Sequence, residues 1–210
     1  AVIRAAAYKS GFAPSAIDTH SYLSADDVLR QSATQPGYPT NKWITAGSTN
    51  VPDFAMNAGI VATYGAMLTN ALKALPSLSL VTSVSNLFDP VTGIYVHPQS
   101  TGLPWERAVS AEWIDPDNTS RFQIDCGVQI QGGAFRGFNL SLKKSFSLQF
   151  RGIYGAGRLE EDLFSGDAVK SFDDLVLRAG ANDGWNKWGH QKTQYIVDEF
   201  MRRTHRAMGG

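Results

Sequence analysis

The sequence predicts an α+β domain in which a mostly antiparallel sheet is flanked by helices. Its 20 glycines and 11% aromatic residues indicate many turns and substantial β content. Several segments after residue 105 alternate apolar and polar side chains with period two, whereas two other segments repeat apolar residues at spacings of three and four. At 210 residues and 43% hydrophobic composition, the chain can bury the core of one full domain.

The N-terminal segment predicts two short strands around a turn. Alternation over residues 2–7 resumes over residues 17–23, after a break that contains Gly11. An isolated two-stranded hairpin is only marginally stable, so we expect this one to belong to a larger sheet whose other strands are missing from this chain.

Two helices are predicted before the main run of strands. Ser24, followed by two aspartates, is suited to cap a short helix that ends at Gln31, and an irregular linker follows it. Residues 57–75 predict a longer helix, ended by Pro76, whose apolar stripe we expect to pack on the β-rich region. The stripe consists of Ile60, Tyr64, Met67, Leu68, Ala71, Leu72 and Leu75.

The second half of the chain predicts most of the sheet. We expect strands over residues 77–84, 106–114, 122–133, 143–151 and 173–180, with a turn and a further short strand over residues 86–96. The clearest alternation puts one apolar face on Phe122, Ile124, Cys126, Val128 and Ile130. A closing helix is predicted over residues 191–208, with Tyr195, Ile196, Phe200 and Thr204 facing inward.

Composition excludes several classes of function. Nineteen basic residues balance 19 acidic ones and form no dense cluster, which argues against a nucleic-acid binder. The single cysteine, Cys126, excludes a disulfide framework and lies on an apolar strand face, where we expect a buried, inert thiol. No apolar run approaches the roughly 20 residues that span a bilayer. No signal peptide precedes the first strand, so we interpret the chain as a piece of a longer polypeptide.

Two segments carry possible binding chemistry. Residues 130–146 join two strands through a loop with Gly132, Gly133 and Arg136 and return with Lys143 and Lys144, an arrangement that can cover nucleotide phosphates. The alternative for this segment is an ordinary hairpin with a solvated loop.

The second segment, residues 175–188, delivers Arg178 at the end of a strand. A polar turn with Asn182 and Asp183 follows it, and strand ends with such turns often bind charged ligands. The alternative is a structural turn in which Arg178 pairs with Asp183.

The same segments carry a resemblance to a known family. The matching runs, in continuous order, are residues 71–98, 105–117, 122–136, 143–159, 171–185 and 194–209. They include KKSFSLQFRGIYGAGRL and SFDDLVLRAGANDGW, and they resemble the CotH kinase family, the spore-coat-protein-H-like proteins of many bacterial secreted multidomain polypeptides. Residues 1–23 resemble the closing strands of an Fn3-like, chitobiase C-terminal type domain, residues 24–70 are then a linker with helices, and residues 71–210 are the N-terminal portion of the kinase-like domain.

This resemblance implies an atypical protein-kinase-like fold that binds ATP with Mg²⁺ and phosphorylates serine or threonine in proteins. The family's loop falls on Gly132, Gly133 and Arg136, its basic strand position on Lys143, and its Arg-x-Gly-x-Asn-Asp turn on Arg178, Gly180, Asn182 and Asp183. Leu142 replaces the usual proline, and Ser147 stands where a basic residue is common.

The resemblance also implies a secreted or cell-surface location. Because the family's later acidic residues do not occur before Gly210, we expect this portion to be inactive without the rest of the parent polypeptide. Its implied partners are a nucleotide and a protein substrate.

A second reading is a non-catalytic adhesion or carbohydrate-associated β-rich module. Two features favour this interpretation: the Fn3-like hairpin and five tryptophans, whose rings can stack on sugars. The alternative for each tryptophan is burial in the core. These tryptophans are Trp43, Trp105, Trp113, Trp185 and Trp188.

Overall fold

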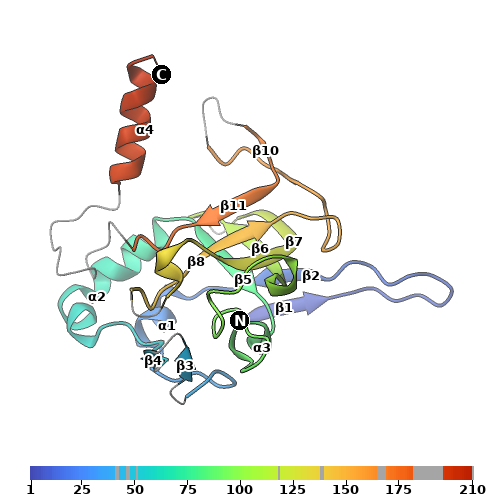
Figure 1. The fold of residues 1–210 in the computed structure, drawn as a ribbon, viewed down its shortest axis with the longest axis horizontal. Helices are drawn as coiled ribbons and strands as arrows, with labels where there is room; N and C mark the ends of the chain where they lie inside the picture. Colours follow the sequence, from blue (N-terminus) through green and yellow to red (C-terminus); the bar gives the residue numbers. More distant parts are fainter. Residues whose placement is uncertain are drawn as a thin grey trace.

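The computed structural model is an α+β fold centred on a five-stranded antiparallel sheet (Figure 1), which confirms the predicted fold class. It describes residues 1–40, 43–45, 48–50, 52–117, 119–137, 140–164, 169–181 and 196–209. In order across the sheet the strands are β11 (Asp174–Leu177), β8 (Ser145–Gln149), β7 (Ser120–Gln131), β6 (Arg107–Ile114) and β5 (Ser77–Val81).

Shorter elements surround this sheet. Two-stranded pairs are formed by β1 (Val2–Ala5) with β2 (Asp18–Ser21), β3 (Trp43–Thr45) with β4 (Ser48–Asn50), and β9 (Leu159–Glu160) with β10 (Ser171–Phe172). The α-helices are α1 (Ala25–Arg30), α2 (Ala58–Lys73), α3 (Val84–Phe88) and α4 (Val197–Ala207), and single 3₁₀ turns cover Leu103–Trp105 and Ala134–Arg136. The β3–β4 pair lies where an irregular linker was expected. No helix among the described residues is long and apolar enough to cross a membrane.

One face of the sheet carries the core, as the period-two pattern predicts. Cross-strand register places Val128 beside Leu148, which in turn lies beside Leu175. Cys126 and Ile130 share this face and are buried, so the predicted apolar side of β7 is confirmed. The opposite face is polar, because alternate residues of the same strands are glutamine, serine, aspartate and glutamate.

The short strand expected within residues 86–96 is wrong. The Asp89 carboxylate accepts hydrogen bonds from the backbone N–H groups of Val91 (2.9 Å) and Thr92 (2.8 Å), which fixes a turn. A Cβ at Gly93 would lie 2.6 Å from backbone atoms of Asp89, so only glycine fits there. Ile94 is nevertheless buried, because the turn itself packs on the core face of the sheet.

The longer predicted helix forms as α2, but its expected contact with the β-rich region is wrong. Asn57 caps the helix by accepting from the N–H of Ile60 (3.1 Å). α2 contacts α1, and Thr69 donates to the Asp26 carboxylate there (3.0 Å). Tyr64 and Met67 of the apolar stripe remain exposed. Spacing predicts the helix and its apolar face, but not the surface on which that face lies.

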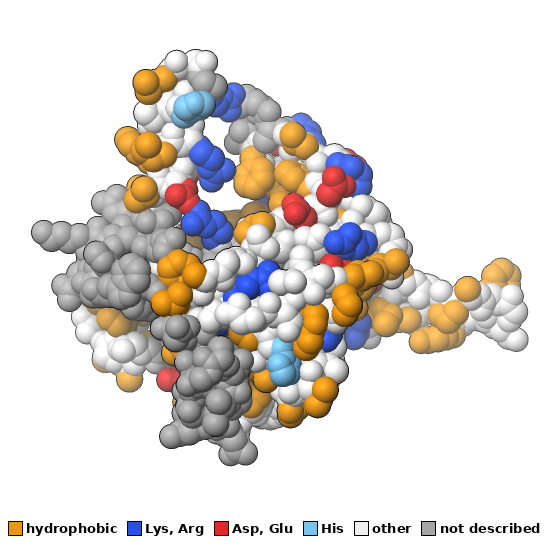
Figure 2. Space-filling model, viewed as in Figure 1, with side chains coloured by type: hydrophobic (Ala, Val, Ile, Leu, Met, Phe, Trp, Pro, Cys, Tyr) orange, Lys and Arg blue, Asp and Glu red, His pale blue; other side chains and the backbone are white. Residues whose placement is uncertain are grey.

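The closing helix is shorter than predicted and does not bury its apolar residues. α4 begins at Val197, and residues 191–195 of the predicted helix lie outside the described part. Ile196 and Phe200, expected to face inward, are 61% and 65% exposed. Figure 1 shows α4 standing away from the sheet, and Figure 2 shows apolar side chains along it. α4 meets the end of β11 through a polar contact, an ion pair between Asp198 and Arg178.

The N-terminal hairpin forms in the predicted alternation and lies against the polar face of the main sheet. β1 and β2 pair antiparallel, and β2 contacts β6 and β7. The loop between the two strands projects from the body (Figure 1). Among the described residues β1 and β2 pair only with each other, so the larger sheet that was expected to have its other strands outside this chain stays a prediction.

Candidate functional site

Three neighbouring strands bring both predicted binding segments to one edge of the sheet. β7 ends as Gln131 pairs with Ser145 at the start of β8, and β11 ends as Leu177 pairs with Phe146. The backbone N–H of Ala179 donates to the Ser145 hydroxyl (2.9 Å), which continues this contact beyond β11. The glycine loop, the two lysines and Arg178 therefore lie at the same edge, although Gly132 and Arg178 are 46 positions apart in the sequence.

The glycine loop is open toward solvent and braced from one side. Gly132 has φ of 121°, a conformation that favours glycine, and nothing lies within 4 Å of a Cβ placed at Gly132 or Gly133. Arg136 donates from Nε to the Gly132 carbonyl (2.5 Å) and from Nη1 to the Ser100 carbonyl (3.1 Å). Partial burial lowers the pKa of the Arg136 guanidinium. Arg136 thus holds the loop in place, whereas the backbone of the two glycines is accessible.

The two lysines before β8 point to opposite sides of the sheet. Lys143 is exposed, on the side that period two assigns to Ser145. Lys144 is 3% exposed, follows the core side of Phe146, and donates to the Ser141 carbonyl. Burial lowers the pKa of the Lys144 ammonium to about 8. Lys143 is therefore the lysine that can meet a ligand from solvent.

Arg178 emerges where the chain leaves β11, as the pattern predicted, and pairs with Asp198 of α4. Gly180 follows with φ of 66°, which allows the sharp turn expected there. Asn182 and Asp183 lie outside the described residues, so their predicted contact with Arg178 stays a prediction.

Buried acidic residues on β6 and just before it were missed by sequence reasoning. Glu106 accepts from the Arg151 guanidinium at 3.0 and 3.3 Å, and its side chain is 1% exposed. Glu112 is also buried and contacts His20 of the hairpin. Glu106, Ser110 and Glu112 occur at even spacings, and that alternation was the available signal for a polar face with buried acids.

The described tryptophans pack internally, which weakens the carbohydrate reading. Trp105 lies against the His97 ring (5.2 Å between centroids) and Trp113 against Phe122 (6.2 Å). The indole N–H of Trp113 donates to Asp115 (3.0 Å). Trp185, Trp188 and the Trp43 side chain lie outside the described part.

Cys126 is buried, as predicted, and burial raises the pKa of its thiol to about 12. Such a thiol stays protonated at neutral pH and is a poor nucleophile.

Two cavities lined by described residues lie away from the glycine-loop edge. Their volumes are about 240 and 390 Å³, they lie on the polar face near the hairpin, and none of their lining residues belongs to the predicted site. Within the described ranges, no group of three or more histidine, cysteine, aspartate or glutamate side chains could hold a metal ion. Comparisons with protein-family models, curated proteins and solved structures match none of them to this chain.

Proposed function

We propose that this chain supplies the nucleotide-binding part of a CotH-like atypical kinase of the bacterial cell surface or secreted fraction, which transfers phosphate from ATP to serine or threonine in proteins. One observation supports this proposal most directly. Four residues come together at one edge of three adjacent strands: Gly132, Gly133, Lys143 and Arg178. Exposed backbone N–H groups and two cations are the groups that recognise polyphosphate, since phosphoryl transfer depends mostly on positioning and charge neutralisation.

Each residue has a separate part in this proposal. The open backbone at Gly132 and Gly133 approaches the phosphates, while Arg136 keeps the loop in place through its carbonyl contacts. Lys143 reaches phosphate as a mobile point charge. Arg178 offers a planar guanidinium, and an anion that binds it competes with Asp198.

The described part of the chain offers no ligand set for Mg²⁺, because no cluster of three suitable side chains occurs there. We therefore assign no metal ligands at this edge and infer that Mg²⁺ accompanies ATP. We propose nucleotide binding for the described residues and assign none of them to the transfer of phosphate.

Lys143→Met is expected to weaken ATP binding about tenfold or more, because a lost charge-assisted contact is worth about 1.5–3 kcal/mol. The measurement is isothermal titration calorimetry of the chain with Mg-ATP. Lys73→Met is the matched control, since Lys73 is exposed in the last turn of α2, away from this edge. Equal ATP affinity in Lys143→Met and the unmodified chain, or no ATP binding by either, would overturn the assignment.

A further inference from the structure

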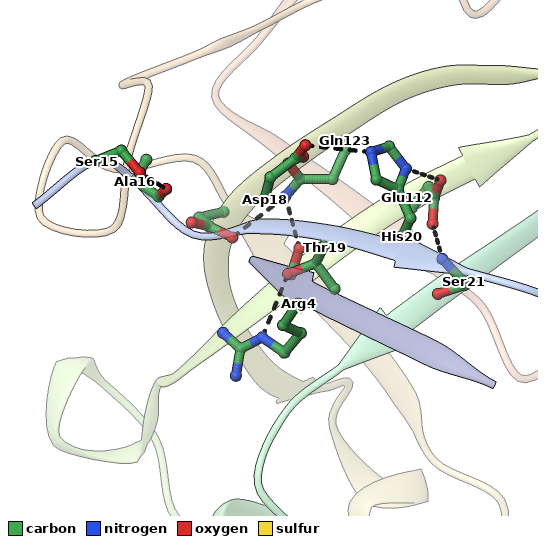
Figure 3. Close-up of polar contacts among 11 residues, drawn as sticks. Arg4, Ser15, Ala16, Asp18, Thr19, His20, Ser21, Glu112 and Gln123 are labelled. Atoms are coloured by element: carbon green, nitrogen blue, oxygen red, sulfur yellow. Dashed lines mark hydrogen bonds and ion pairs between the residues drawn. The ribbon is translucent and has the colours of Figure 1, made fainter. Parts of the chain in front are cut away.

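A buried carboxylate ties the N-terminal hairpin to the polar face of the main sheet. Glu112 lies in β6, between β7 and β5, and its side chain is 4% exposed. It accepts from the backbone N–H of Ser21 at 2.6 Å and contacts Nδ1 of His20 at 3.2 Å (Figure 3). The Ser21 hydroxyl also meets the Ser79 hydroxyl at 2.7 Å, so β2 has polar contacts with β5 as well as with β6.

The imidazole of His20 faces a carboxylate on each side. Nδ1 contacts Glu112 from the sheet, and Nε2 lies 3.3 Å from the carboxylate of Asp18 on the same strand as His20. Both carboxylates are hydrogen-bond acceptors, and a neutral imidazole has only one N–H to donate. Only the doubly protonated ring can donate to both. The neutral ring must turn a lone pair toward one of the two carboxylates.

The other charged groups around the hairpin have different contacts. Arg4 on β1 donates to the Thr19 hydroxyl (3.3 Å), and Asp125 on β7 accepts from Gln123 (3.3 Å). Arg121, also on β7, pairs with Asp115 at 2.9 Å. The strands on which the hairpin lies bring no other described cation to Glu112. β5 has no charged side chain, and Arg107 of β6 donates to backbone carbonyls. Tyr22 lines the same cavity as His20. Of the described residues, His20 is the basic residue with a ring nitrogen within 4 Å of the Glu112 carboxylate.

We propose that His20 is a proton-dependent clamp, which holds the β1–β2 hairpin on the sheet as an imidazolium and loosens it as a neutral ring. Two independent features support this device. The buried Glu112 carboxylate needs a compensating charge, and His20 supplies it across the interface. The hairpin is also a two-stranded unit, whose position depends on contacts with the sheet because such a pair is marginal alone. The clamp is independent of the proposed nucleotide site.

The direction of the pH effect follows from the contacts of His20. The hydrogen bond to Glu112 and the charge of Asp18 raise the pKa of His20 above its ordinary value of 6.5. A raised pKa means that the protonated form stabilises the docked hairpin. This stabilisation is fully present below pH 6.5 and is lost as pH rises through the higher pKa of docked His20.

The test is amide hydrogen exchange in the intact chain, followed by NMR between about pH 5.5 and pH 8.5, the range in which a histidine titrates. The Ser21 amide reports docking directly, because it donates to Glu112. We expect its protection factor to fall with rising pH, by about tenfold for each unit by which docking raises the pKa of His20. Amides in the middle of β7 should keep their protection and thereby report that the sheet stays folded.

Two substitutions separate the clamp from general effects of pH. His20→Gln keeps one donor but cannot become charged, so its Ser21 protection should be independent of pH. Asp18→Asn removes one acceptor, so a neutral His20 can serve Glu112 without facing a second carboxylate, and the pH dependence should shrink. His205→Gln, on exposed α4, should behave as the unmodified chain does. Unchanged Ser21 protection while His20 titrates, or full pH dependence in His20→Gln or Asp18→Asn, would overturn the proposal.

Discussion

Leu148→Ala is expected to lower the free energy of unfolding by about 2–5 kcal/mol, the range for removing a buried leucine side chain. Leu148 is 0% exposed and lies in β8, the strand between β7 and β11. Its cross-strand neighbours are Val128 and Leu175, and sheet strands on both sides limit how far the structure can collapse into the cavity. Urea denaturation followed by tryptophan fluorescence measures the change.

Leu142→Ala is the matched control, since it removes the same atoms three residues before β8. Leu142 is 63% exposed, and its backbone carbonyl, which accepts from the Tyr95 hydroxyl (2.7 Å), is unchanged by the substitution. The expected loss there is within about 0.5 kcal/mol. Equal losses for the two substitutions would contradict the placement of Leu148 in the core.

The sheet was predictable because one chemical pattern determines each of its strands. Because apolar and polar residues alternate along β7, only one orientation of the strand puts its apolar side chains in the core. A shift of its pairing register by one residue would expose Cys126, Val128 and Ile130 together. The same pattern placed Lys144 on the core side and Lys143 on the open side, and the burial of Lys144 agrees with it. An alternation with period two thus predicts which face of the sheet a side chain lies on, as well as the secondary structure.

The placement of the helices was not predictable in this way. The stripe of α2 and the apolar residues of α4 specify an amphipathic helix, but any apolar surface can cover such a face. α2 instead contacts α1 through a pair that is far apart in sequence, Thr69 and Asp26. Hydrogen bonds between remote polar side chains leave no periodic signal, and the same holds for Glu112 and His20.

Part of the candidate site was visible in the sequence, because strand order follows from hairpin connections. β7 and β8 are joined by the glycine loop, so Gly132 and Lys143 had to lie near the same edge. The arrival of β11 on the far side of β8, which adds Arg178, required the structure. The role of Arg136 also required it, since a loop arginine can donate to a ligand or, as here, to carbonyls of its own chain.

Gly127→Ala is expected to destabilise the protein by about 1–3 kcal/mol, the usual cost of adding a carbon to a filled interior. A Cβ at Gly127 would lie 2.3 Å from Oε1 of Glu106 and 2.7 Å from its Cγ. Glu106 has little room to move, because its side chain is 1% exposed and its carboxylate accepts from the Arg151 guanidinium. The added methyl group must therefore displace a buried carboxylate from its cation, and a lower thermal midpoint in calorimetry would report the loss.

Gly65→Ala is the control for adding the same atom to a glycine of this chain. Gly65 lies inside α2, where alanine adopts the helical backbone freely, and nothing lies within 4 Å of its Cβ position, so stability should stay the same or rise by up to about 1 kcal/mol. A double-mutant cycle then identifies the cause of the Gly127 effect. In a Glu106→Ala background the clashing atoms are absent, so Gly127→Ala should cost much less there than in the unmodified chain. An equal cost in both backgrounds would show that the conflict lies in the β7 backbone, and Glu106 would lose its assigned place over Gly127.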